Sequence, residues 1–143
     1  MMKLSENIQD RLDDLSVQGN ELCDASKFDE AIQKWRGAME LLPEPRTDWE
    51  AYTWLSASIG DAQYHLGQFD AARDSFYDAL NGSGGVANPF IYYRLGQSLV
   101  RLGDESRGLK NLLKAYMLDG EQIFFADDDG EEYLKKLQDN NLI

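Results

Sequence analysis

Apolar side chains recur every three or four positions over most of the chain, which is the spacing of one face of an α-helix. The first such stretch carries Leu4, Ile8, Leu12, Leu15 and Leu22, separated mainly by acidic and polar residues. Strict alternation of apolar and polar residues persists nowhere, so no strand is predicted. The pattern predicts helices over residues 4–24, 28–42, 48–66, 69–80, 89–102 and 105–118, and a last helix over about 131–140.

Capping signals indicate where some of these helices begin. Ser5 or Asn7 is placed to cap the first helix. Thr47 and Glu50 have the spacing of a capping box, in which a hydroxyl and a carboxylate satisfy the first free amides of a helix. The third helix is therefore expected to begin at about Asp48.

Glycine and proline indicate further boundaries. Gly67 is expected to close the third helix and Gly103 the fifth, because glycine readily adopts the left-handed conformation that ends a helix. Asn88 followed by Pro89 reads as a cap and a first helical residue. Residues 121–126 form a short apolar piece without a predicted conformation.

The chain repeats itself. Small residues align at Gly19, Gly60 and Gly96, which are 41 residues apart (19 to 60) and 36 residues apart (60 to 96). The same offsets align three further sets of residues: Ala31, Ala72 and Gly108; Trp35, Phe76 and Leu112; Ala38, Ala79 and Ala115. Small residues on both helices of a hairpin let the helix axes approach closely, and a large residue one turn away fills the gap. An isolated hairpin buries too little apolar surface, so several hairpins are expected to stack.

These aligned positions resemble the tetratricopeptide repeat (TPR) family over residues 12 to 120. The third copy departs from the family pattern, because Glu105 stands where an aromatic residue is usual and Gly108 where alanine is usual. The resemblance implies a single all-α domain over residues 1–143, built from antiparallel helical hairpins stacked as a short right-handed α-solenoid. The implied repeats cover about 12–45, 47–86 and 88–120, and residues 121–143 form a capping segment. The alternative is an unrelated helical bundle.

The family repeat is about 34 residues long. The first interval here is longer by about two helical turns. The extra residues are expected to lengthen the third helix at its start, where they would carry Trp49 and Tyr52.

In the family, the first helix of each hairpin lines a concave groove that binds the partner. The resemblance therefore implies a partner-binding surface made of aromatic, polar and charged side chains from three helices. These residues are Asn20, Trp54, Asp61, Tyr64, His65, Phe90, Tyr93, Arg94, Gln97 and Arg101. Aromatic anchors with one or two arginines are typical of protein-recognition surfaces.

One branch of the family clamps the carboxylates of chaperone tails with lysine, asparagine and arginine. Asn20 matches one of these positions, but Ser16, Ala57 and Asp61 occupy the basic ones. Asp61 would repel a carboxylate, so the sequence argues against a clamp of this kind.

The net charge of the chain indicates which classes of partner it favours. The chain has 26 acidic and 14 basic residues, a formal net charge of −12. This charge disfavours nucleic acid and anionic membranes as partners and favours a basic protein or peptide. Cys23 is the only cysteine, so no disulfide within the chain is expected. The sequence shows neither a signal peptide nor a membrane span, and a cytoplasmic location is expected.

No catalytic, cofactor or metal site is predicted. His65 has no acid, nucleophile or metal ligand at motif spacing. The acidic run around Asp127–Glu131 lacks the spaced oxygen ligands of a calcium loop, and a helix N-terminus that favours negative charge explains it.

Two functions remain open. The first is a non-catalytic interaction module that binds a protein or peptide in its concave groove. The alternative is an acidic immunity protein that neutralises a basic, nuclease-like bacterial toxin by direct binding. The length, the acidity and the ending from Phe124 to Leu134 resemble stand-alone bacterial repeat proteins, some of which are immunity proteins.

Overall fold

The computed structural model describes residues 3–143, and over this range the chain is helical without a strand. Seven α-helices and three short 3-10 helices alternate with brief connections. They are α1 (Glu6–Asp24), α2 (Phe28–Glu40), η1 (Arg46–Asp48), α3 (Glu50–His65), α4 (Phe69–Leu80), η2 (Gly85–Ala87), α5 (Pro89–Arg101), α6 (Glu105–Asp119), η3 (Glu121–Phe125) and α7 (Gly130–Asp139). The predicted all-α class is confirmed, and residues 121–125, for which the pattern predicts no conformation, form η3.

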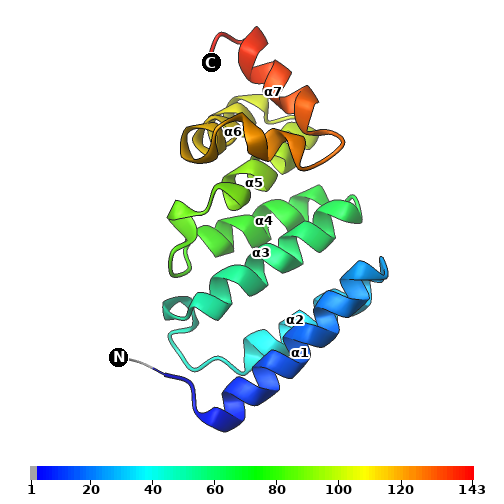
Figure 1. Cartoon of the computed structure of the whole chain (residues 1–143), viewed down its shortest axis with the longest axis vertical. Helices are drawn as coiled ribbons and strands as arrows, with labels where there is room; N and C mark the ends of the chain where they lie inside the picture. The colour runs from blue at the N-terminus through cyan, green and yellow to red at the C-terminus, as the bar shows by residue number, and fades with distance from the viewer. Residues whose placement is uncertain (1–2) are drawn as a thin grey trace.

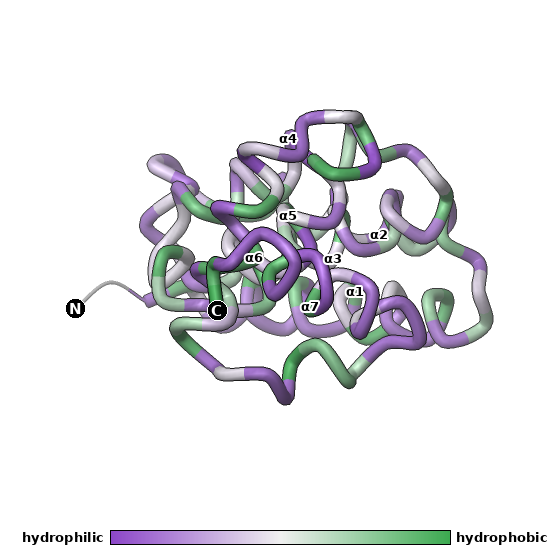
Figure 2. Tube along the Cα trace, turned by 90° about the horizontal axis from the view of Figure 1, so that it is seen from above, coloured by the Kyte–Doolittle hydropathy of each residue, from purple (hydrophilic) through white to green (hydrophobic). Residues whose placement is uncertain are grey.

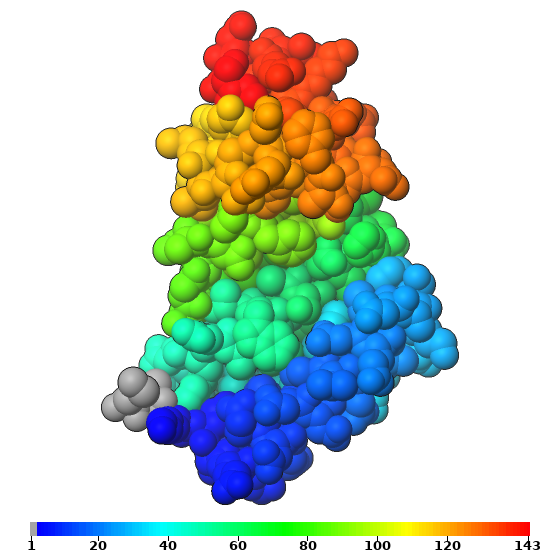
Figure 3. All heavy atoms as spheres, in the orientation of Figure 1, coloured from blue at the N-terminus to red at the C-terminus, as the bar shows by residue number. Residues whose placement is uncertain are grey.

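Three hairpins, α1–α2, α3–α4 and α5–α6, follow one another along the long axis of the molecule (Figure 1). The second helix of each hairpin packs against the first helix of the next, and α7 packs on α6 at the C-terminal end. In the space-filling view the hairpins appear as successive bands from the N-terminal to the C-terminal end (Figure 3). This arrangement is the predicted α-solenoid.

Each hairpin turns in the same way. The first helix ends in a residue with positive φ, Gly67 (76°) in the second hairpin and Gly103 (87°) in the third. Ser26 (60°) takes this position in the first hairpin. The amide of the next residue then donates to a carbonyl five residues back in all three hairpins, at 2.8, 2.9 and 2.9 Å. The repeat found in the sequence is therefore also a repeat of backbone conformation.

The aligned glycines lie where the two helices of a hairpin touch. A Cβ atom on Gly96 would stand 2.7 Å from Leu112 Cγ and 2.9 Å from the Gly108 carbonyl oxygen. Gly19 and Gly60 lie in the same way against Trp35 and Phe76. The small and large residues of the repeat thus fill each other's space, as their spacing predicts.

The start of α3 differs from the prediction. Residues 46–48 form η1, and α3 begins only at Glu50, with Trp49 as an extended N-cap residue. The predicted capping box at Thr47 is therefore wrong. The Thr47 carbonyl accepts from the Ser83 amide at 3.0 Å, and the Trp49 indole donates to the Pro43 carbonyl at 2.8 Å. These bonds hold residues 46–49 as a connection, so most of the extra residues do not lengthen the helix.

The predicted caps of α1 and α5 are confirmed. Ser5 caps α1 by accepting from the Ile8 amide, and Asn88 caps α5 by accepting from the Phe90 amide. Pro89 is the first residue of α5. The second helix ends at Glu40, two residues earlier than predicted.

Apolar side chains form three buried clusters, one for each successive step of the stack. The first joins α1, α2 and α3, the second α3, α4 and α5, and the third α5 and α6 with η3 and α7. Seen along the stack, apolar and polar segments alternate along the helices, as one-sided burial requires (Figure 2). No helix among residues 3–143 combines the length and apolar character needed to cross a membrane.

The close approach at Gly96 gives a stability test. We expect Gly96→Ala to lower the free energy of unfolding by about 1 to 3 kcal/mol, because the added methyl group overlaps Leu112 and a backbone carbonyl. Gly37→Ala in α2 is the control, since its methyl group would meet only Leu15 at an ordinary 3.7 Å. It should stabilise the protein by about 0.5 to 1 kcal/mol through helix propensity. Urea unfolding followed by circular dichroism measures both, and equal effects would contradict the packing described.

Candidate functional site

The predicted partner-binding residues lie on the face formed by α1, α3 and α5, which we call the A-helix face. Its two halves differ. The half at α5 is covered by the C-terminal segment, whereas the half between α1 and the start of α3 is open and hollowed. The two halves are therefore described separately.

Arg94 is the centre of the covered half. Only 5% of this residue is exposed. Its Nε donates to Asp61 of α3 at 2.9 Å, and its Nη1 donates to Asp127 at 2.8 Å and to Gln97 at 2.7 Å. The guanidinium thus joins α3, α5 and the segment that follows η3.

Aromatic rings complete the surroundings of Arg94. The guanidinium carbon lies 4.6 Å from the ring centre of Tyr64, 5.5 Å from that of Phe90 and 5.8 Å from that of Tyr93. Burial lowers the pKa of Arg94, but the carboxylates of Asp61 and Asp127 more than compensate, and the pKa is raised. Arg94 is therefore a permanently charged group whose charge is neutralised within the chain.

The C-terminal segment covers α5 around this arginine. The Tyr93 hydroxyl donates to Asp127 at 2.9 Å, and burial, followed by this contact with Asp127, raises the pKa of Tyr93. Phe124 of η3 packs edge-to-face on the Tyr93 ring, with centres 5.2 Å apart. Tyr133 of α7 is buried as well, and burial together with the nearby Tyr64 raises its pKa. This half of the A-helix face is thus occupied by the chain itself.

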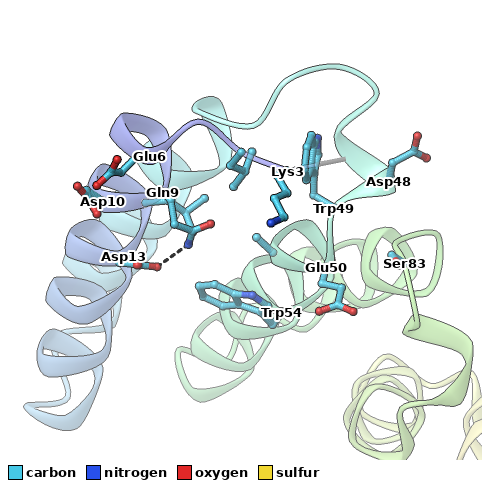
Figure 4. Close-up of a pocket in the computed structure, with 13 residues that line it drawn as sticks. Lys3, Glu6, Gln9, Asp10, Asp13, Asp48, Trp49, Glu50, Trp54 and Ser83 are labelled. Carbon is cyan, nitrogen blue, oxygen red and sulfur yellow. Dashed lines mark hydrogen bonds between the residues drawn. The ribbon is translucent and has the colours of Figure 1, made fainter. Parts of the chain in front are cut away.

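The open half contains a pocket of about 1020 Å³ (Figure 4). It lies between α1 on one side and η1, the N-terminal part of α3 and the loop before η2 on the other. The residues that line it are Lys3, Leu4, Glu6, Gln9, Asp10, Leu12, Asp13, Asp48, Trp49, Glu50, Ala51, Trp54 and Ser83. A volume of this size accommodates several side chains of a ligand.

Between the two halves lies His65. Its Nε2 is 3.6 Å from an Asp61 carboxylate oxygen, and its ring stacks on Phe28 with centres 5.2 Å apart. Cys23 lies in the same region, and burial, followed by the negative charge of Asp61, raises the pKa of its thiol. His65 has a packing partner and an acidic neighbour here. Over residues 3–143, no cluster of three or more histidine, cysteine or acidic side chains is arranged to hold a metal ion.

The structure distributes the predicted residues unevenly. Asn20, Trp54, His65 and Arg101 are exposed, and Asp61 and Phe90 are half-buried. Tyr64, Tyr93, Arg94 and Gln97 are buried, the last three beneath or beside the C-terminal segment. That all ten bind a partner stays a prediction, and the exposed members are the ones a partner reaches without displacing this segment.

Glu6 and Asp10, which the sequence did not suggest as binding residues, line the pocket beside Trp54. Glu6 and Asp10 precede Asp13 on α1 at intervals of four and three residues, which places all three on one face of the helix. This spacing was a readable signal. Trp49 joins them because residues 46–49 form an irregular connection, whereas the sequence predicts the start of a helix there.

No protein-family model and no curated protein matches this sequence. Among solved structures, the chain is similar to the first TPR domain of Spaghetti (RPAP3), determined bound to the HSP90 peptide SRMEEVD. The TM-score is 0.71 over 94% of this chain and 95% of that chain, with 18% sequence identity. This similarity shows the fold, and the chain is an α-solenoid of the TPR type, as the sequence predicts.

The contact between Arg94 and Asp127 gives a second test. We expect Asp127→Asn to lower the free energy of unfolding by about 1 to 3 kcal/mol, because it removes the negative charge opposite a buried guanidinium. The same change should make α7 more open to trypsin at Lys135 and Lys136, measured as the rate of cleavage under native conditions.

Asp128→Asn is the matched control. Asp128 is an exposed neighbour without a hydrogen bond or ion pair among the described residues, so its variant should unfold and be cleaved like the parent. If both variants behave alike, the Asp127 contact does not hold the C-terminal segment in place.

Proposed function

We propose that this chain is a protein-interaction module that binds a segment of a partner protein along the open half of the A-helix face. The observation that carries the proposal is the pocket between α1 and α3, with the 38% exposed indole of Trp54 in its wall. Exposed tryptophan beside a large hollow is the kind of anchor that dominates binding energy in protein interfaces.

The similar solved structure supports this class of function. The TPR domain of Spaghetti binds a peptide, and solenoids of stacked hairpins present extended surfaces suited to such ligands. A role as a binding scaffold agrees with the contacts of the reactive side chains. His65 stacks on Phe28, Cys23 packs against the first apolar cluster, and Tyr93 donates to Asp127.

The chemistry of the open half argues against an acidic ligand. Carboxylates line it, and Asp61 stands where a clamp for a carboxylate needs a basic residue. Arg94 is already neutralised by Asp61 and Asp127. We therefore expect this chain to bind a basic or neutral segment of its partner. The peptide bound by the Spaghetti domain, SRMEEVD, is instead acidic.

The alternative of an immunity protein against a basic toxin shares the expectation of a basic partner. No similar protein in the comparisons supports that more specific role. A cytoplasmic location likewise stays a prediction from the sequence.

A peptide library displayed on phage and selected on the purified protein tests the proposal. We expect enriched peptides whose affinity, measured by calorimetry, falls at least about tenfold in Trp54→Ala, since loss of a central aromatic anchor costs about 2 kcal/mol or more. Met117→Ala is the control, because Met117 is 75% exposed on α6, away from the A-helix face. It should bind within about twofold of the parent. Enriched peptides that are lost with Met117→Ala and kept with Trp54→Ala would place the binding surface elsewhere.

A further inference from the structure

We infer that the pocket between α1 and α3 is a recognition site for an arginine side chain of a basic protein segment. This inference rests on the proposed function and specifies which side chain of the partner the pocket recognises. It is carried by three observations on the pocket: carboxylates without ion partners, exposed indole surface, and a cation of the chain's own.

The α1 wall of the pocket is negative. Glu6, Asp10 and Asp13 follow one another on α1 at the spacing of one helical face, and all three are exposed and line the pocket (Figure 4). Asp13 accepts a hydrogen bond from the Gln9 amide at 2.8 Å, but none of the three forms an ion pair with a residue in the range 3–143. Their charges are thus unneutralised within the described chain, in contrast to Asp61 and Asp127.

The opposite wall joins charge to aromatic surface. Asp48 and Glu50 add two further carboxylates, again without an ion pair over the described range. Between them and α1 lie the indoles of Trp49 and Trp54. A guanidinium stacks on an indole face and bonds carboxylates with its planar edge, so this combination fits arginine better than it fits a compact ammonium group.

Lys3 gives the pocket a cation of the chain's own. It is the single basic residue among those that line the pocket. In Figure 4 its side chain lies between the indoles of Trp49 and Trp54. Lys3 is exposed and makes no ion pair with the described residues, so its ammonium group is not fixed there. An arginine from a partner would compete with it.

Negative charge alone does not single out this place. The C-terminal end of the chain is also acidic, and Asp128, Asp129, Glu131 and Glu132 line a smaller hollow there. That hollow contains Phe125 and no indole. Both hollows attract a cation through their negative charge, but only the pocket combines carboxylates with indoles. Comparing the two therefore distinguishes general electrostatic attraction from recognition of arginine.

The test uses the full chain labelled with ¹⁵N and an acetylated, amidated tetra-arginine peptide as the probe. The chain has three indole N–H signals, from Trp35, Trp49 and Trp54. We expect the peptide to shift the Trp49 and Trp54 signals and to leave Trp35 in place, because Trp35 is only 3% exposed and lies in the core. The same peptide with citrulline, which is uncharged and of similar shape, should shift none of them.

Two triple variants test where the charge acts. Glu6→Gln, Asp10→Asn and Asp13→Asn together should weaken the tetra-arginine peptide by about tenfold, whereas Asp128→Asn, Asp129→Asn and Glu131→Gln together should weaken it by about twofold at most. Both sets remove three negative charges, so their effects on net charge are equal.

Two single variants should change the affinity for the tetra-arginine peptide in opposite directions. Trp54→Ala should weaken the peptide at least about fivefold through loss of the stacking face. Lys3→Ala should raise the affinity for the peptide by about twofold, because this change removes the competing cation. Lys110→Ala, at an exposed position on α6, should leave the affinity nearly unchanged. Circular dichroism confirms that each variant keeps its helix content.

The outcomes separate this inference from the proposed function. Equal weakening by the two triple variants, or peptide shifts that spare Trp54, would overturn the arginine site. If peptides selected from the library still depend on Trp54 but carry no basic residue, the interaction module stands and the arginine site fails. If tetra-arginine binds as expected while no library peptide depends on Trp54, the pocket binds arginine and the proposed function fails.

Discussion

The close contact between the two helices of each hairpin determines the geometry of this molecule. At Gly96 the backbone of α5 lies so near Leu112 and the Gly108 carbonyl that an added Cβ atom would overlap both, and Gly19 and Gly60 lie close to the side chains of Trp35 and Phe76 in the other hairpins. The hairpins then stack on one another, each burying the apolar face that its neighbour leaves open. The A-helix face, and with it the pocket, is a consequence of this spacing.

The fold was predictable because its determinants are local. Small and large residues recur at fixed offsets, and several boundaries are marked by a glycine with positive φ or a side-chain cap such as Asn88. The start of α3 was not predictable in this way. Thr47 and Glu50 have the spacing of a capping box, but the Thr47 carbonyl bonds to Ser83, a residue from the next connection. A tertiary contact overrides the local signal there.

The candidate site was predictable only in part for the same reason. The family pattern places Trp54 and Arg94 on one face, and the structure agrees that both lie on the first helices of their hairpins. No pattern of spacing indicates that Asp127, far along the chain, returns to neutralise Arg94. The alignment also cannot show that Trp49 joins Trp54 beside the α1 carboxylates, because its position depends on the irregular connection before α3.

The position of Arg94 also bears on how the chain unfolds. In a stack of repeats, contacts run between neighbours, so terminal units open at little cost to the rest. Arg94 bonds Asp61 and Asp127, each 33 residues away, and thereby joins the second hairpin, the third hairpin and the C-terminal segment in one polar network. Release of the segment that carries Asp127 then leaves the Arg94 guanidinium short of a counter-charge beside α3 as well as α5. The C-terminal part should therefore melt together with the central hairpin as one cooperative unit, while the first hairpin, outside this network, is free to exchange its amide hydrogens earlier.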